Sequence, residues 1–325
     1  MKYQKVIIWG HPFGSHTHSY VHEGFYRAFK HLGYDTYWFH DHNFPKDFNY
    51  NDCLFITEGF ACREIPILKT SCYAVMYCPD PSRFQEAGHY IDMRSTAYNF
   101  KDHIYDYSVN ENCQTVGPTC FFEPKRPNSI RFKNNHVDKI IDDFDKFYLG
   151  WCSNLLPHEI NLEDRFRPRK QVIHFCGSLG HSGQFENYSA WAPFIQKCYK
   201  HQIQFVHNCP WQNPLSTEEV IRRVQESILA PDIRGPEHCR TGVITCRLFK
   251  NISYGHLGMT NSKHMADTMP GLCIYHEKTD DLFELGMANS QNFDIIKEAM
   301  LFVKDNHTYI NRITSLLKSI TLSRP

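Results

Sequence analysis

Short apolar runs alternate with amphipathic stretches in the first part of the chain, a pattern typical of parallel strands joined by helices. The apolar run Lys5–Trp9 leads through a polar loop at residues 10–16 into a helical stretch that ends at Leu32. The extended segment Asp35–Phe39 then completes a strand–helix–strand unit. Two further apolar runs bounded by turn or polar residues are Cys53–Thr57 and Tyr73–Tyr77. They predict additional parallel strands that are buried on both faces.

The same pattern recurs in the second half of the chain. The apolar run Val172–Phe175 enters a glycine-rich turn, and a helical stretch around Trp191–Tyr199 leads back to an extended segment, Ile203–His207. The later segments expected to be regular are a helix from Ser216, a strand at Ser227–Ala230, a helix after Gly242, a strand at Leu272–His276 and closing helices to Ser319. Between residues 80 and 145 the pattern is irregular and predicts no definite element.

The two series predict two domains of the α/β class. A chain of 325 residues is long for one doubly wound domain and suits two, each with its own core. The boundary is expected between Tyr148 and Arg169, where a charged, proline-containing stretch separates the two series. We therefore predict Rossmann-like domains at residues 1–155 and 156–325 that face each other across a cleft.

Composition narrows the partners that such a chain would bind. The 35 basic and 35 acidic side chains cancel, so nucleic acid is not an expected partner. Aromatic residues at 14% and 20 histidines supply groups that stack on sugars or bases and titrate near neutral pH, which favours small polar ligands. The 13 cysteines lack the spacing of a secreted scaffold, and no apolar run is long enough for a transmembrane segment. These features favour a cytoplasmic protein.

The glycine-rich turn after the strand at Val172–Phe175 is the strongest local signal of a binding site. It spans residues 176–183 and precedes a helical segment. Glycine allows the backbone to approach a ligand closely, and the helix that follows presents unpaired N–H groups to phosphate. Its spacing matches neither the dinucleotide motif nor the P-loop, and a connecting turn without a ligand is the alternative. The candidate donor-binding residues in this turn are Gly177, Ser178, Gly180 and His181.

A second signal is the segment at residues 245–255, which combines cationic and apolar side chains. Arg247 and Lys250 are three residues apart and share one face of a helix, where they would form a compact site for a diphosphate. Apolar neighbours would bury the segment and direct the two cations, whereas on an exposed helix such a pair is usually just solvated surface. Asn251 and Ser253 complete the expected donor site.

Polar side chains follow two of the expected strands in the first domain, at the edge where open α/β sheets bind ligands. The loop after the first strand carries His11, His16 and His18, predicted on the acceptor side, with His16 as a candidate base. His16, His18 and His22 suggest a metal cluster, but no cysteine or carboxylate stands at matching spacing, so a metal site is not expected. Asp80 follows the strand at Tyr73–Tyr77 and is placed to accept a proton from an attacking hydroxyl. The alternative is a turn role, which is common for an Asp between prolines.

At the level of architecture, the chain resembles glycosyltransferases of the GT-B fold over nearly its whole length, and the motifs above carry a more specific resemblance. Residues 172–184 are similar to the strand and Gly-Ser turn with which phage DNA β-glucosyltransferase and its relatives hold a nucleotide diphosphate. Residues 247–258 resemble the helix that contacts the donor phosphates in these enzymes. Residues 227–232 correspond to the segment that runs past the nucleotide base and ribose. Asp80 stands in a position similar to the general base of the phage enzyme. The resemblance does not cover residues 86–147, and the chain lacks the Glu-x7-Glu pattern of retaining members, which favours inversion.

The resemblance implies transfer of a sugar from a nucleotide-sugar donor to a glycan, lipid-linked or small-glycoside acceptor. The residues expected to hold the donor diphosphate are Ser178, Gly180, Arg247 and Lys250. Asp80, or else His16, would deprotonate the acceptor while the cations stabilise the departing nucleotide, so neither a metal ion nor another cofactor is expected. The alternatives are a nucleotide-sugar epimerase and a non-catalytic nucleotide-sugar-binding or scaffold protein.

Overall fold

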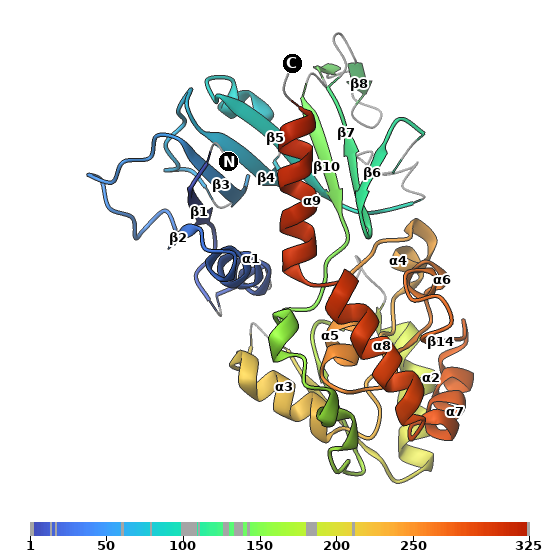
Figure 1. Ribbon diagram of the computed structural model, residues 1–325. Coiled ribbons are helices and arrows are strands. Elements are labelled where there is room, and N and C mark those ends of the chain that lie inside the picture. The colour runs from blue at the N-terminus through green and yellow to red at the C-terminus, as the bar shows by residue number, and fades with distance from the viewer. Residues whose placement is uncertain are drawn as a thin grey trace. The chain divides into compact units, whose positions relative to one another are not determined.

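The chain forms two compact units, shown in the computed structural model of Figure 1. The residues whose structure is described are 3–13, 15–16, 18–59, 62–78, 80–98, 109, 111–125, 130–132, 139–141, 144–179, 187–209 and 212–323. Unit 1 joins Met1–Leu149 with Tyr309–Pro325, and unit 2 is Gly150–Thr308. The chain thus leaves unit 1 at Leu149, whereas the sequence places the boundary after residue 155, and the last helix belongs to unit 1.

Unit 1 is built on an eight-stranded sheet with the order β2-β1-β3-β4-β5-β10-β7-β6. Neighbouring strands from β2 to β10 in this order are parallel, and β7 and β6 join antiparallel. The bounds are β1 Lys5–Trp9, β2 Asp35–Phe39, β3 Cys53–Glu58, β4 Cys72–Met76, β5 His89–Ser95, β6 Gln114–Gly117, β7 Cys120–Glu123 and β10 Asp145–Leu149. A separate antiparallel pair consists of β8 (Ile130–Phe132) and β9 (Lys139–Ile141).

The strand sequences explain why this sheet is the core of unit 1. The side chains of β1, β3 and β4 are almost all buried, as parallel strands covered on both faces require. Helices α1 (Ser19–His31) and α9 (Tyr309–Leu322) pack against each other and against the sheet (Figure 1). An aromatic cluster beside the sheet includes Trp9, Tyr50, Phe55, Tyr73 and Phe84. The apolar runs of the sequence therefore form the strands that position the first candidate site.

Helices α1 and α9 approach each other closely at a glycine. A Cβ atom on Gly24 of α1 would lie 2.2 Å from Cε2 of Tyr309. The rings of Phe25 and Tyr309 meet edge-on with centroids 5.0 Å apart. Farther along α9, Arg312 is fully buried and its Nη1 donates to the Pro118 carbonyl at 3.0 Å. These contacts attach the last helix of the chain to unit 1.

Gly24→Ala is expected to lower the free energy of unfolding, because the added methyl group must displace the Tyr309 ring. Overpacking of this kind costs about 1–3 kcal/mol, and the better helix propensity of alanine returns only about 1 kcal/mol. Urea unfolding followed by circular dichroism measures the change. Lys30→Ala, at an exposed position of the same helix, is the control and should stay within about 0.5 kcal/mol of the wild type. A Gly24→Ala protein as stable as the wild type would contradict this packing.

Unit 2 consists of short parallel strand pairs and surrounding helices (Figure 1). The strands are β11 Val172–Cys176, β12 Gln204–Asn208, β13 Met259–Thr260 and β14 Ile274–Tyr275. The helices are η2 Pro157–Glu159, η3 Leu162–Phe166, α2 Asn187–Lys200, α3 Thr217–Glu226, α4 Pro236–Thr241, α5 Arg247–Ser253, α6 Lys263–Asp267, α7 Thr279–Asn289 and α8 Phe293–Asn306. Parallel bridges from Lys170 to Ser227 and from Asp232 to Thr260 place residues 227–232 between β11 and β13. The segment expected as a strand at residues 227–230 forms isolated contacts of this kind and is not a regular strand.

The α/β class predicted from the sequence is confirmed by the large, mostly parallel sheet of unit 1 and the helices of both units. Local signals also hold in unit 2, where the Ser216 hydroxyl accepts from the backbone N–H of Glu219 and caps α3. The irregular stretch between residues 80 and 145 contains β5 to β9. The finer prediction, two Rossmann-like domains of the GT-B type, stays a prediction.

Candidate functional site

The carboxyl ends of β1, β3 and β4 form the first candidate site, in unit 1. The chain passes from β1 through α1 to β2 on one side of β1, whereas β3 lies on the other side. Open α/β sheets bind ligands beyond the carboxyl ends of their strands at such a switch point. His11 follows β1, Glu58 is the last residue of β3, and Tyr77 follows β4. The topology therefore brings these three side chains to one edge of the sheet.

Glu58 is the centre of a histidine cluster at this edge. Its side chain is only 3% exposed, and Oε1 lies 2.9 Å from Nε2 of His22 in α1. Oε2 lies 3.1 Å from His18 Nδ1 and 3.8 Å from His11 Nε2. A Cβ atom on Gly10 would lie 2.0 Å from His22 Cε1. Glycine at position 10 therefore makes room for the ring that α1 brings to the carboxylate.

The histidines keep Glu58 ionised. Burial alone raises the pKa of Glu58, but the contacts with His18 and His22, and the charges of these rings when they are protonated, outweigh burial and hold this pKa well below its usual range. Burial lowers the pKa of His11 and of His16, and the charges of neighbouring histidines lower both further while Glu58 opposes them. His11 and His16 are therefore neutral at pH 7. The site combines a buried carboxylate with imidazoles that can accept protons.

Tyr77 lies against the cluster in a strained backbone conformation. Its ring stacks on that of His18, with centroids 5.1 Å apart and planes 10° apart. Its hydroxyl lies 3.0 Å from Oγ of Ser95, at the end of β5. The φ angle of 51° at Tyr77 is in the left-handed region, which costs a non-glycine residue about 1–3 kcal/mol. Strain of this kind is found mainly at functional sites, where the surrounding contacts maintain it.

His16 lies beside the cluster without contacting Glu58 within ion-pair distance among the described residues. Its ring stacks on His11 with centroids 4.4 Å apart and meets the His18 ring edge-on at 4.7 Å. His16 Nδ1 accepts a hydrogen bond of 3.2 Å from the backbone N–H of His18. The structure thus brings together the three histidines predicted from the sequence. It also places the Glu58 carboxylate beside two of them, His11 and His18.

Asp80 has the contacts of a capping residue. It is exposed and precedes the short helix η1 (Pro81–Phe84). Its Oδ1 accepts from the backbone N–H of Ser82 at 3.1 Å and from the Ser82 hydroxyl at 2.5 Å. This is the turn role that the sequence left open as the alternative. No contact among the described residues supports Asp80 as a base, and its assignment as a base stays a prediction.

Glu58 and Tyr77 are site residues that the sequence reasoning missed, and His22 was considered there only as a possible metal ligand. The expected strand ended at Thr57, and the carboxylate directly after it was not considered. The signal was available, because Glu58 directly follows the expected strand Cys53–Thr57, and Asp80 was considered for a similar position after the expected strand Tyr73–Tyr77. Nothing in the spacing indicates that His22, one helical turn beyond His18, faces the end of another strand.

The second candidate site lies in unit 2 at the carboxyl end of β11. Arg247, the first residue of α5, lies over the Phe175 ring with Cζ 4.1 Å from the centroid. Its Nη2 donates to the Cys176 carbonyl at 3.5 Å. A Cβ atom on Gly177 would lie 2.2 Å from the same Nη2, so glycine permits this approach. In the part of the chain that the structure describes, no carboxylate forms an ion pair with Arg247.

Positive charge exceeds negative charge around Arg247. Burial and the charge of Arg234 together lower the pKa of Arg247 to about 10, although the charge of Asp232 opposes this shift. Asp232 is fully buried, and both of its carboxylate oxygens contact Arg234, so its charge is already matched. Burial raises the pKa of Cys176, while the charges of Arg247 and Lys250 oppose the rise. The charges of the two cations predicted for the donor site therefore both affect the thiol of Cys176, at the carboxyl end of β11.

Two other residues predicted for the donor site are engaged inside unit 2. Asn251 is buried, and its Nδ2 donates to the Ala230 carbonyl at 2.8 Å. The fully buried Ser253 hydroxyl lies 2.8 Å from the hydroxyl of Ser153. These contacts attach α5 to the core of the unit. They give Asn251 and Ser253 a structural role in orienting the helix that carries Arg247.

The glycine-rich turn is described only in its first part. Gly177 and Ser178 lie at the end of β11, and both are within the described residues. Gly180 and His181 lie outside them. Within the described part of this turn, support for the predicted donor site therefore comes from the close approach of Arg247 to Gly177.

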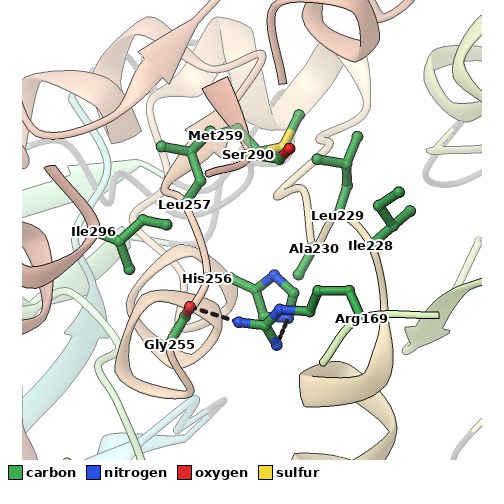
Figure 2. A pocket seen from close by; sticks show the side chains of 10 residues that line it. All are labelled: Arg169, Ile228, Leu229, Ala230, Gly255, His256, Leu257, Met259, Ser290 and Ile296. Carbon is green, nitrogen blue, oxygen red and sulfur yellow. Dashed lines mark hydrogen bonds between the residues drawn. The ribbon is translucent and has the colours of Figure 1, made fainter. Parts of the chain in front are cut away.

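A pocket elsewhere in unit 2 is lined by Arg169, His256 and apolar side chains, as Figure 2 shows. Nη2 of Arg169 donates to the Gly255 carbonyl at 2.8 Å, and Nη1 lies 3.0 Å from His256 Nε2 (Figure 2). Nη1 also donates to the Gln225 carbonyl. Burial lowers the pKa of His256 to about 3, so this ring is neutral. Because the polar groups are bonded to each other and to carbonyls, this pocket is a weaker candidate than the edge at Arg247.

Among the described residues, no group of three or more His, Cys, Asp or Glu side chains has the geometry to hold a metal ion. The described chain also contains no helix long and apolar enough to cross a bilayer. Comparisons of the chain with family models, curated proteins and solved structures found no match. The two candidate sites lie at the carboxyl ends of strands, and one holds a carboxylate and histidines whereas the other holds cations.

Proposed function

We propose that this protein is a glycosyltransferase that moves a sugar from a nucleoside-diphosphate donor to a hydroxyl acceptor. The observation that carries the proposal is the half-buried guanidinium of Arg247, which lies against Gly177 and forms no ion pair among the described residues. A cation that is partly removed from water is stabilised by an anion or by several acceptors beside it. We assign the donor diphosphate as that anion.

The surroundings of Arg247 favour phosphate as its partner. A guanidinium presents a planar fork of N–H donors that matches two phosphate oxygens. Gly177 has no side chain to keep a ligand away from the backbone. Lys250 follows Arg247 on the same face of α5 and adds a second positive charge. These cations would also stabilise the charge that develops on the departing nucleoside diphosphate, so we propose a reaction that does not depend on a metal ion.

Unit 1 supplies the proton acceptor in this proposal. The acceptor oxygen forms a bond to the anomeric carbon while the bond between sugar and phosphate breaks, and the bonding electron pair leaves with the nucleoside diphosphate. The hydroxyl proton passes to a base of the protein. Histidine is suited to this role near neutral pH, and the site at Glu58 holds several imidazoles. A single displacement of this kind inverts the configuration of the sugar.

Arg247→Ala and Lys250→Ala are each expected to weaken the binding of UDP and GDP without unfolding the protein. Loss of one charge-assisted contact costs about 1.5–3 kcal/mol, which is about a 10- to 100-fold increase in Kd. Titration calorimetry measures it. Lys200→Ala, an exposed cation at the end of α2, is the matched control and should leave the Kd unchanged. Unchanged affinity in both test variants would remove these residues from the donor site.

The proposed reaction itself is tested with a panel of nucleotide sugars. A donor that binds only the folded protein raises the melting temperature, so a thermal-shift screen identifies it. The donor is then incubated with a panel of hydroxyl acceptors, and release of nucleoside diphosphate together with a glycosylated product supports transfer. Turnover of the donor without an acceptor would indicate an epimerase instead. Binding without turnover for every acceptor would indicate a non-catalytic binding protein.

A further inference from the structure

We infer that Glu58 fixes the tautomer of His18 and thereby makes Nε2 of His18 the proton acceptor of unit 1; the catalytic part of this inference rests on the proposed function. His18 Nδ1 lies 3.1 Å from Glu58 Oε2. An ionised carboxylate only accepts hydrogen bonds, so Nδ1 must carry a hydrogen. In the neutral ring, Nε2 then has a free lone pair directed away from Glu58.

Glu58 is held firmly enough to act as a positioning residue. It is buried at the end of a central strand, and its other oxygen, Oε1, lies 2.9 Å from Nε2 of the fully buried His22. His22 Nδ1 lies 3.5 Å from the His11 carbonyl, which also accepts. The pKa of Glu58 stays well below its usual range because His18 and His22 outweigh the effect of burial. The carboxylate therefore remains charged through the neutral pH range.

Tyr77 fixes the plane of the His18 ring. The two rings are nearly parallel, and the Tyr77 hydroxyl is tied to Ser95 at the end of β5. The left-handed backbone at Tyr77 costs free energy that an ordinary strand end does not require. The charged or titratable groups that face His18 are thus Glu58 from β3, His11 and His16 from the loop, His22 from α1 and Tyr77 after β4.

His18 is better placed than its neighbours to receive a proton. Its side chain is 33% exposed, and no described residue hydrogen-bonds its Nε2. His22 also contacts Glu58, but it is fully buried and out of reach of a substrate. His16 is exposed, but its Nδ1 accepts from the backbone N–H of His18 and no carboxylate orients it. Of the described histidines at this site, only His18 combines a carboxylate bonded to one nitrogen, a ring stacked on Tyr77 and a partly exposed side chain whose second nitrogen has no partner among the described residues.

The test measures the tautomer of His18 directly. Long-range ¹H–¹⁵N spectra of histidine-labelled protein, recorded where the rings are neutral, distinguish hydrogen on Nδ1 from hydrogen on Nε2. The His18 signal is identified by its loss in His18→Gln. We expect the hydrogen on Nδ1 in the wild type. In Glu58→Leu, which has no acceptor at this position, we expect that preference to disappear and kcat to fall by about 10²–10⁴-fold.

Glu58→Gln covers the case in which Glu58→Leu does not fold. Its amide can both donate to and accept from Nδ1, so we expect His18 to become a mixture of the two tautomers. Nucleoside-diphosphate affinity should stay unchanged in both variants, because the donor residues belong to unit 2. Hydrogen on Nε2 in the wild type, or one tautomer shared by the wild type and the variants, would overturn the inference. If no donor and acceptor pair gives turnover, the proposed function fails, whereas the spectra still decide whether Glu58 orients His18.

Discussion

Asp232→Ala is expected to lower the free energy of unfolding of unit 2 by about 3–5 kcal/mol, because it leaves a buried guanidinium without its counter-ion. Asp232 is fully buried, and its Oδ2 accepts from Arg234 Nε at 3.0 Å and from the Thr260 hydroxyl at 3.3 Å. The Arg234 side chain is only 10% exposed. Arg247 lies close enough for its charge to repel that of Arg234 once the carboxylate is lost. Urea unfolding followed by circular dichroism measures the effect.

Two controls separate the loss of the buried charge pair from a general effect of mutation. Asp267→Ala removes a carboxylate whose ion pair with Lys263 is exposed, and it should cost no more than about 1 kcal/mol. The double variant Asp232→Leu with Arg234→Met replaces both charges by apolar groups and should recover most of the stability. If Asp232→Ala cost no more than Asp267→Ala, Asp232 and Arg234 would not form a buried pair in solution.

The fold could be predicted from the sequence where the signal is local. Strands β1, β3, β4 and β11 are short apolar runs next to turn residues, and each was expected within a few residues of its position. Strand β5 was missed because its centre contains Asp92 and Arg94, which read as surface residues. The structure buries both and pairs them with each other, the Arg94 Nε donating to Asp92 Oδ2 at 2.6 Å. Such a pairing is a tertiary contact that strand propensity does not express.

A tertiary contact also explains why α9 belongs to unit 1. The segment Tyr309–Leu322 reads correctly as a helix, but nothing in its own pattern indicates its partner. The partner is decided by Gly24, which lets the Tyr309 ring pack against α1. The two residues are far apart in the chain, so a division of the sequence into consecutive halves cannot represent this contact.

For the candidate sites too, the sequence predicted local neighbours but not tertiary contacts. The spacing of Arg247 and Lys250 correctly placed them on one short helix, because neighbours on a helix follow from sequence alone. The spacing could not show that Asn251 points into the core. Likewise, the loop histidines were recognised, but their carboxylate partner Glu58 comes from a strand 40 residues after His18. A site assembled from several strand ends depends on topology that only the structure provides.

His18→Ala is expected to reduce turnover by about 10²–10⁴-fold, whereas Asp80→Asn should retain most of it. The physical reason is that His18 Nε2 is an oriented and accessible base, while Asp80 caps η1 through Ser82. Asparagine also caps helices, so Asp80→Asn keeps the local structure and removes only the ability to take up a proton. Kinetics with the donor and acceptor identified by screening measure both variants, with nucleoside-diphosphate affinity as the control that the donor site is intact.

The comparison distinguishes three possible bases. If Asp80→Asn abolished turnover while His18→Ala retained it, the carboxylate after β4 would be the base, and His18 would be a structural neighbour of Glu58. If His16→Ala alone abolished turnover, the exposed ring that stacks on His11 would be the base. We expect neither, because Asp80 is engaged in capping η1 through Ser82, and no carboxylate among the described residues orients His16. A collapse in His18→Ala together with unchanged donor affinity would place proton transfer in unit 1 and donor binding in unit 2.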